Sequence, residues 1–247
     1  MGKIKGDDMS KDSGWIMVEG KKCRIICNGE GGPAVLLGTF PLDTDDSEHI
    51  FKRINDLSRN KAFLLSVYQV SDWGKDFSPY PARNALDGSE FSGGGKETLT
   101  WLSGSLIPYI KERYKTDGIY TAGYSLSGLF ALWSLYNMDT LSGAACCSGS
   151  LWYDGWDRFM EENRVKGKDL TVYLSLGTKE EKTRNPVVSM VGDRTRQQEK
   201  MLLNEPSVSH VTLEWNQGGH FADSAERLAK GISWLIETLT ASSSHDQ

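Results

Sequence analysis

The feature that most constrains the fold of this chain is an alternation of short, continuous apolar runs with segments of helical spacing. Ala34–Phe40, Ala62–Val70 and Leu170–Leu176 are predominantly apolar, which is typical of strands buried on both faces of a parallel sheet. Asp46–Leu57 and Leu126–Tyr136 show the spacing of helices between such runs. Strands that alternate with helices predict a mostly parallel sheet covered by helices on both faces.

The remaining segments continue this pattern. Trp15–Val18 and Cys23–Cys27 predict an N-terminal hairpin. Further strands are predicted at Gly118–Gly123, Gly143–Cys147 and Val211–Trp215, and further helices at Glu97–Tyr114, Asp193–Leu203 and Ala222–Leu239. The stretch Ser71–Gly95 is predicted to be a long functional loop. Trp152–Lys168 is expected to be a polar connection too short for a lid.

Composition narrows the class of protein. The 247 residues carry 28 Lys and Arg against 33 Asp and Glu, a net charge of −5, and no basic stripe that would favour nucleic acid or an anionic membrane. No apolar run reaches the roughly 18 residues of a membrane span, and the start lacks the apolar core of a secretory signal. We therefore expect a cytoplasmic protein with one domain over residues 14–240 and flexible tails at 1–13 and 241–247.

The sequence contains no motif for a cofactor or a metal. The four cysteines, Cys23, Cys27, Cys146 and Cys147, lack zinc spacing and are expected to be buried thiols in a reducing compartment. The glycines before Lys96 do not complete a phosphate-binding loop. We expect no cofactor and no metal, and a homo-oligomer is compatible with the sequence.

The strongest local signal for chemistry is Gly123-Tyr124-Ser125-Leu126-Ser127-Gly128, between a predicted strand and a predicted helix. This is the setting of a nucleophile elbow, whose sharp turn needs small flanking residues such as Gly123. Ser125 is the candidate nucleophile. Ser127 replaces the second glycine of the usual pattern, which predicts a slightly strained elbow. The alternative is a Gly- and Ser-rich turn without a catalytic role.

The candidate general base is His220 in Gln217-Gly218-Gly219-His220-Phe221, which follows the last predicted strand. The glycines allow an unusual backbone path, and the chain order of serine before histidine matches a nucleophile-elbow hydrolase. His49, His210 and His245 are better explained as surface or tail residues. A general base must reach the serine, so His220 is predicted to lie beside Ser125.

The candidate acid lies between the two, in the charged segment that follows Leu170–Leu176. Glu180 comes three residues after Gly177, where a carboxylate could hold the imidazole in its useful tautomer. Glu181 and Asp193 are alternatives. A solvated charge cluster is the remaining explanation, and it would leave a dyad of serine and histidine.

Two backbone amides are predicted to stabilise an oxyanion. The N–H group of Leu126 opens the predicted helix after the serine. The second donor is expected in the turn after the strand at Ala34–Leu37, with Phe40 preferred to Thr39 on position alone.

These segments together resemble the putative-esterase (esterase D-like) family of α/β-hydrolases, from about Ala34 to Leu239. The resemblance rests on Asp76-Phe77-Ser78-Pro79, FSGGGKETLTWLSGSLIPYIKERY, TAGYSLSGLFALWSLY, SLGTKEE and GGHF. It implies an α/β-hydrolase fold, with Ser125 as nucleophile, His220 as base and an acid near Glu180. The branch looks similar to bacterial siderophore (trilactone) esterases. Ser127 and the GTF segment at 38–40 depart from the family pattern, which bears on the oxyanion details.

We therefore expect a serine esterase that acts on a small-molecule ester. Tyr124, Trp152 and Tyr153 are predicted to contact substrate, and aromatic residues of the long loop predict a cleft suited to aryl or siderophore-type esters. Two alternatives stay open: an acyltransferase on the same scaffold, which product analysis with alcohol acceptors would reveal, and a non-catalytic binding protein with a hydrolase fold.

Overall fold

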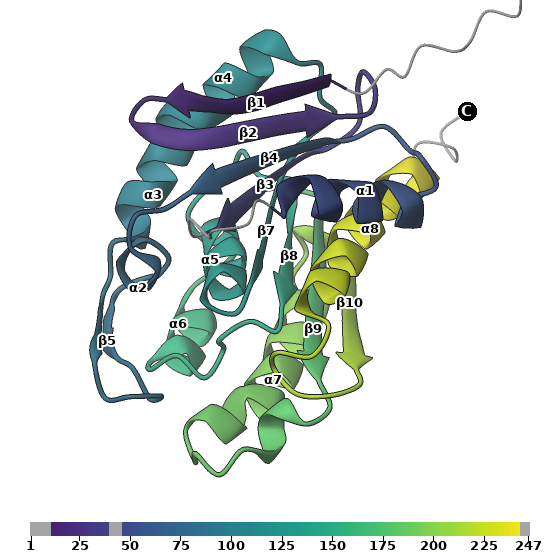
Figure 1. The fold of residues 1–247 in the computed structure, drawn as a ribbon. Helices are drawn as coiled ribbons and strands as arrows, with labels where there is room; N and C mark the ends of the chain where they lie inside the picture. Colours follow the sequence, from purple (N-terminus) through teal and green to yellow (C-terminus); the bar gives the residue numbers. More distant parts are fainter. Residues whose placement is uncertain (1–10, 40–45, 243–247) are drawn as a thin grey trace, which may run out of the picture.

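An eight-stranded sheet runs through the computed structural model, which describes residues 11–39 and 46–242 (Figure 1). Its strand order is β1-β2-β4-β3-β7-β8-β9-β10. The strands are β1 (Lys11–Val18), β2 (Lys21–Cys27), β3 (Ala34–Thr39), β4 (Leu64–Gln69), β7 (Ile119–Tyr124), β8 (Gly143–Cys147), β9 (Leu170–Gly177) and β10 (Val208–Asn216). The β1–β2 and β2–β4 pairs are antiparallel, and all later pairs are parallel. The predicted mostly parallel sheet is confirmed.

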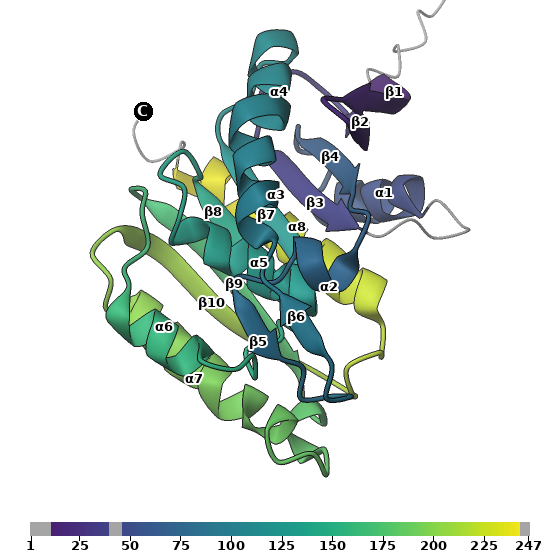
Figure 2. The ribbon, with the colours of Figure 1, turned by 90° about the vertical axis from the view of Figure 1, so that its left-hand side faces the viewer.

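Helices cover both faces of this sheet (Figures 1 and 2). One face carries α1 (Ser47–Leu57) and α8 (Ser224–Ser242). The other carries α3 (Gly95–Trp101), α4 (Ile107–Arg113), α5 (Leu126–Leu135), α6 (Trp156–Glu162) and α7 (Val191–Leu203), with a π-helical turn at Leu102–Leu106 between α3 and α4. Pro108 follows that turn and lacks the N–H group that a regular helix would use, which accounts for the irregularity.

Two hydrophobic cores result from the alternation of side chains along each strand. Leu36 belongs to the core beneath α3–α7, whereas its neighbours Val35 and Leu37 belong to the core beneath α1 and α8. This is why the central strands carry apolar side chains on both faces, and it is the physical basis of the sequence prediction.

The structure adds elements that the sequence pattern did not predict. The stretch expected to be a long loop contains α2 (Trp73–Asp76) and a small hairpin of β5 (Pro81–Arg83) and β6 (Glu90–Ser92). The expected polar connection contains α6, which buries Trp156 and Met160 on one face. Strand β1 starts at Lys11, before the expected domain boundary at residue 14, because Lys11 and Asp12 still pair with β2. Helix α8 likewise continues to Ser242, past residue 240.

The carboxyl ends of β7, β8, β9 and β10 lie level with one another, as the pairing of Tyr124 with Cys147, Cys147 with Ser175 and Gly177 with Asn216 shows. The strand order reverses beside β3, which is where open α/β sheets hold their ligands. All four cysteines are buried free thiols, as predicted. Across residues 11–39 and 46–242, no helix combines the length and apolarity needed to cross a membrane.

Candidate active site

Ser125 occupies the sharp turn between β7 and α5. Its backbone lies at φ 61° and ψ −123°, in a region that non-glycine residues rarely adopt. Three hydrogen bonds hold this conformation: the Ser125 N–H donates to the Cys147 carbonyl at 3.1 Å, and the Ser125 carbonyl accepts from Leu129 at 3.0 Å and Ser150 at 3.1 Å. The strained backbone therefore presents the Ser125 hydroxyl at the carboxyl end of the sheet.

The residues that flank the turn explain its composition. A Cβ atom on Gly123 would lie 2.2 Å from the carbonyl oxygen of Ser127, so only glycine is accommodated there. Ser127 itself is buried, and its hydroxyl accepts a hydrogen bond from the Tyr124 N–H and donates one to the Tyr124 carbonyl, both at 2.9 Å. The side chain that replaces glycine thus makes two hydrogen bonds across the elbow.

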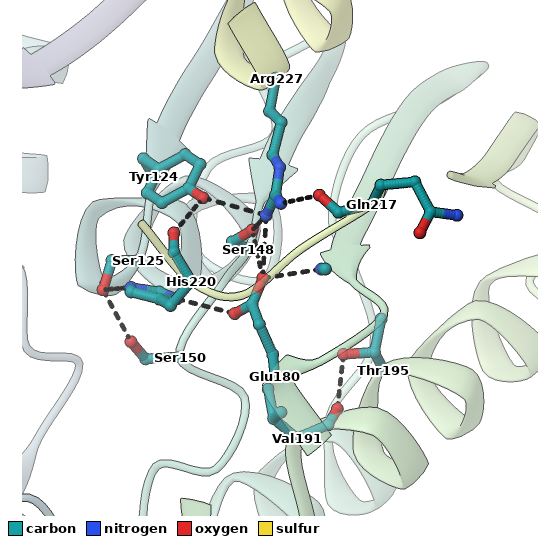
Figure 3. Close-up of polar contacts among 11 residues, drawn as sticks. Tyr124, Ser125, Ser148, Ser150, Glu180, Val191, Thr195, Gln217, His220 and Arg227 are labelled. Atoms are coloured by element: carbon teal, nitrogen blue, oxygen red, sulfur yellow. Dashed lines mark hydrogen bonds and ion pairs between the residues drawn. The ribbon is translucent and has the colours of Figure 1, made fainter. Parts of the chain in front are cut away.

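His220 reaches Ser125 from the loop that follows β10 (Figure 3). Its Nε2 atom lies 3.0 Å from the Ser125 Oγ atom. The hydroxyl of Tyr124 donates to the His220 carbonyl at 2.5 Å, and this hydrogen bond fixes the backbone of the loop at His220. Burial raises the pKa of the Tyr124 hydroxyl above its usual value, so this donor keeps its proton.

Glu180 completes the chain of contacts. Its Oε2 atom lies 2.7 Å from His220 Nδ1, and its Oε1 atom accepts from the Gly177 N–H at 2.7 Å and from the Ser148 hydroxyl at 2.8 Å. Burial by itself raises the pKa of this carboxyl, but the hydrogen bond and charge of His220, with the donors from Ser148 and Gly177, outweigh burial and hold the pKa below its ordinary value. Glu180 is therefore an ionised acceptor for the imidazole.

The alternative acids lie elsewhere. Glu181 binds Arg196 at 2.8 Å, and Asp193 binds the same guanidinium at 3.0 Å. The Asp193 side chain is 92% exposed. Among the three carboxylates considered from the sequence, Glu180 is the one that the fold brings to His220.

The structure describes two of the three predicted oxyanion donors, Leu126 and Thr39. Leu126 is the first residue of α5, and the first intrahelical bond is donated by Leu129, so helix geometry leaves the Leu126 N–H without an intrahelical acceptor. Phe40 lies outside the described residues. Thr39, the second choice, is the last residue of β3.

A pocket of about 350 Å³ opens beside Ser125 and His220. Its walls are mainly apolar, with Trp152 from the segment after β8, Leu86 from the β5–β6 hairpin and Phe221 from the histidine loop. Val188 and Val191 line it from the start of α7, and Lys179, Glu180, Thr183, Ser148 and Gly149 supply the polar part. The fold thus provides an apolar chamber with its reactive groups at one end.

Two predicted substrate contacts are corrected by the structure. Tyr153 is fully buried and donates its hydroxyl hydrogen bond to the Tyr80 carbonyl, so it packs the β5–β6 hairpin onto the body. Tyr124 holds the His220 loop and does not line the pocket. Among the aromatic residues of the predicted cleft, Trp152 lines the pocket, whereas Phe77 of the long loop is buried in the core.

The mouth of the pocket is unusually apolar for a protein surface. Leu86 is 65% exposed and Phe221 is 91% exposed, and both line the pocket. Val187 and Met190, beside the lining residue Val188, are also exposed. The amide of Asn185 donates to the Ala85 carbonyl at 2.6 Å and joins the hairpin tip to the segment before α7. The mouth is therefore formed by the hairpin tip, the segment before α7 and the histidine loop.

The sequence prediction missed three polar residues at the site. Ser148 and Ser150 follow β8, with Ser150 Oγ 3.4 Å from Ser125 Oγ, and their position just after a strand could have identified them. Arg227, in the first turns of α8, is buried against Glu180 with 3.2 Å between Nη1 and Oε1. Nothing in the local sequence distinguishes Arg227 from a surface arginine.

The sequence matches the model of one known protein family. The model of a family described as putative esterase matches residues 59–221, which is more than half of the chain. No curated protein matches the sequence significantly.

Solved structures share the fold at low sequence identity. The siderophore hydrolase EstB from Aspergillus nidulans matches at a TM-score of 0.68 and 14% identity, over 96% of this chain and 98% of that one. An IroE-like serine hydrolase from Shewanella oneidensis matches at 0.69 and 17%, over 92% and 79%. The enterobactin esterase FES from Shigella flexneri matches at 0.62 and 16%, over 93% and 60%. These similarities establish the α/β-hydrolase type of fold.

Proposed function

Because this chain belongs to the putative esterase family, we propose that it hydrolyses carboxylic esters through an acyl-enzyme formed on Ser125. The observation that carries the proposal is the continuous contact from Ser125 Oγ to His220 Nε2 at 3.0 Å and from His220 Nδ1 to Glu180 Oε2 at 2.7 Å. This is the arrangement of a nucleophile, a base and an orienting acid.

The proposed reaction has two halves. Ser125 Oγ attacks the ester carbonyl while His220 Nε2 accepts the hydroxyl proton, and the alcohol leaves with that proton as the tetrahedral intermediate collapses. Water then attacks the acyl group with His220 again as base, and the acid product leaves Ser125. The ionised Glu180 accepts the Nδ1–H bond, which keeps the Nε2 lone pair directed at Ser125 and stabilises the imidazolium.

The developing oxyanion requires donors near the Ser125 hydroxyl. The N–H group of Leu126, at the start of α5, is the proposed first donor. Phe40 stays the predicted second donor.

For the substrate, we propose an ester with a bulky aryl or siderophore-type acyl group. The apolar pocket of about 350 Å³ with Trp152 in its wall supports this class. A substrate larger than the pocket would also cover the exposed Leu86 and Phe221 at the mouth, and burial of their apolar surface would favour binding. The siderophore hydrolase EstB and the enterobactin esterase FES share the fold of this chain, which supports that substrate class.

The first test removes the nucleophile. Ser125→Ala should lower kcat for a chromogenic aryl ester by roughly 10³-fold or more, because it removes the hydroxyl that contacts His220 Nε2. A serine-directed phosphonate should add to Ser125 and nowhere else, as measured by mass spectrometry of the digested protein. Normal activity of the variant, or an adduct on another serine, would contradict the proposal. Product analysis with an added alcohol separates hydrolysis from acyl transfer.

The substrate class is tested at the mouth with a matched pair of leucines. Leu86 lines the pocket and is 65% exposed, whereas Leu203 is 64% exposed and does not line it. Leu86→Ser should lower kcat/KM for a bulky aryl ester, relative to an acetate ester of the same alcohol, by roughly two- to tenfold. Leu203→Ser should leave that ratio unchanged. Equal ratios in both variants would mean that the mouth does not contact the acyl group.

A further inference from the structure

Arg227 is a buried arginine directly behind the proposed acid. It is 1% exposed, yet its guanidinium has four hydrogen-bond partners (Figure 3). The Nη1 atom donates to Glu180 Oε1 at 3.2 Å, to the Ser148 hydroxyl at 3.3 Å and to the Tyr124 hydroxyl at 3.3 Å. The Nη2 atom donates to the Gln217 carbonyl at 2.8 Å. A buried charge is tolerated only when it is paired and hydrogen-bonded in this way.

The two carboxylate oxygens of Glu180 have different partners. Oε1 is occupied by Arg227, Ser148 and the Gly177 N–H, whereas Oε2 faces His220. A Cβ atom on Gly177 would lie 2.8 Å from Oε1 and 2.9 Å from Arg227 Nη1, so the strand end must be glycine for this cluster to close. The carboxylate is held from one side and presents the other to the imidazole.

The same guanidinium also holds the histidine loop. It binds the loop directly through the Gln217 carbonyl, and indirectly through Tyr124, whose hydroxyl donates to the His220 carbonyl. Arg227 therefore touches both the acid and the backbone that carries the base. A planar, rigid fork of donors suits this task better than a lysine ammonium, which acts as a point charge.

We propose that Arg227 is a positioning residue of the active site: by binding Glu180 Oε1 and the loop of His220 together, it sets the acid and the base in register with Ser125. This inference rests on the proposed function. A merely structural arginine would affect the amount of folded protein, whereas a positioning arginine also affects the contribution of Glu180 to kcat.

A double-mutant cycle between Arg227 and Glu180 tests this. In the wild-type background, Arg227→Lys should lower kcat roughly 10- to 100-fold, the range of coupling between residues in contact, with KM for a small ester unchanged. In the Glu180→Gln background, the same change should lower kcat by a clearly smaller factor, at least about threefold smaller, because the carboxylate is gone and only the contacts of Arg227 with the histidine loop remain. Arg227→Met should lower kcat further than Arg227→Lys.

Folding is controlled separately. Arg227→Met removes the guanidinium that pairs with the buried Glu180 and risks unfolding. Thermal unfolding and circular dichroism therefore accompany every kcat, and the lysine variant carries the cycle if the methionine variant fails. Arg194 is the matched control: it is also buried, and it binds the Tyr153 carbonyl and Asp157 away from Glu180. Any loss caused by Arg194→Lys should be the same in both backgrounds.

The outcomes separate the inference from the function on which it rests. Equal losses from Arg227→Lys in both backgrounds would overturn the joint positioning of acid and base, because Arg227 would then act independently of Glu180, while Glu180 and the serine mechanism stand. If Glu180→Gln alone keeps full activity, Glu180 is not the acid, and the positioning role falls with it. Non-additive losses in the Arg227 cycle and additive losses in the Arg194 cycle would support the proposal.

Discussion

Helix α8 carries two ion pairs on consecutive residues in opposite environments. Glu226 pairs with Arg53 of α1 at 2.6 Å, with side chains that are 35% and 41% exposed. Arg227 pairs with Glu180 at 3.2 Å, with side chains that are 2% and 5% exposed. The shorter contact is the one that water reaches, so distance alone does not rank the two pairs.

The difference follows from the turn of the helix, which directs successive side chains about 100° apart. Glu226 faces α1 at the protein surface, where competition from water and salt leaves a pair with little net effect. Arg227 points under the carboxyl ends of the strands, where both charges need partners and each added hydrogen bond restricts geometry. The surface pair joins two helices, whereas the buried pair joins α8 to Glu180, the carboxylate that contacts His220.

The largest expected difference between the buried and the surface ion pair is in kcat. Glu180→Gln should lower kcat by roughly 10²- to 10⁴-fold, by analogy with other serine triads, because the imidazole loses its ionised acceptor. Glu226→Gln, an identical chemical change one helix residue from Arg227, should leave kcat near the wild-type value. Both are measured with one chromogenic ester.

Glu181→Gln and Asp193→Asn serve as further controls, since both side chains bind Arg196. A crippled Asp193→Asn would move the acid to α7. Full activity in all four variants would leave a dyad of Ser125 and His220.

A smaller effect concerns stability against acid. The pKa of Glu226 is lowered by its hydrogen bond with Arg53, and the pKa of Glu180 is lowered net of burial, chiefly by His220. A depressed pKa stabilises the folded state above the ordinary glutamate value of about 4.3, and this stabilisation is lost as pH falls through the folded-state pKa. The difference in free energy of unfolding between wild type and either Gln variant should therefore be full at neutral pH and shrink in acid.

Salt distinguishes the two carboxylates in that experiment. At roughly 1 M salt the screening length is about 3 Å, so the acid-dependent difference for Glu226→Gln should largely vanish. The difference for Glu180→Gln should persist because its charges are buried. Urea titrations at several pH values, with and without salt, measure both. Equal salt sensitivity would mean that water reaches Glu180 as readily as Glu226.

Much of this protein is determined by local sequence. The apolar runs at β3, β4 and β9 specify a buried parallel sheet because their apolar side chains are shared between two cores, one on each face. The elbow around Ser125 is specified because a sharp turn admits glycine at 123 and little else. His220 and Glu180 were predictable as candidate site residues because each follows closely after a strand, β10 and β9.

Other features have no local signature, because they depend on segments distant in the chain. Glu180 and Glu181 are chemically equivalent neighbours, and only the direction in which the turn after Gly177 points them separates the one that meets His220 from the one that meets Arg196. Tyr153 and Trp152 are adjacent aromatics, one buried against the hairpin and one in the pocket wall. Arg227 lies in an ordinary helical sequence, and the packing of α8 beneath β7, β8 and β9 decides that its charge is buried behind the acid.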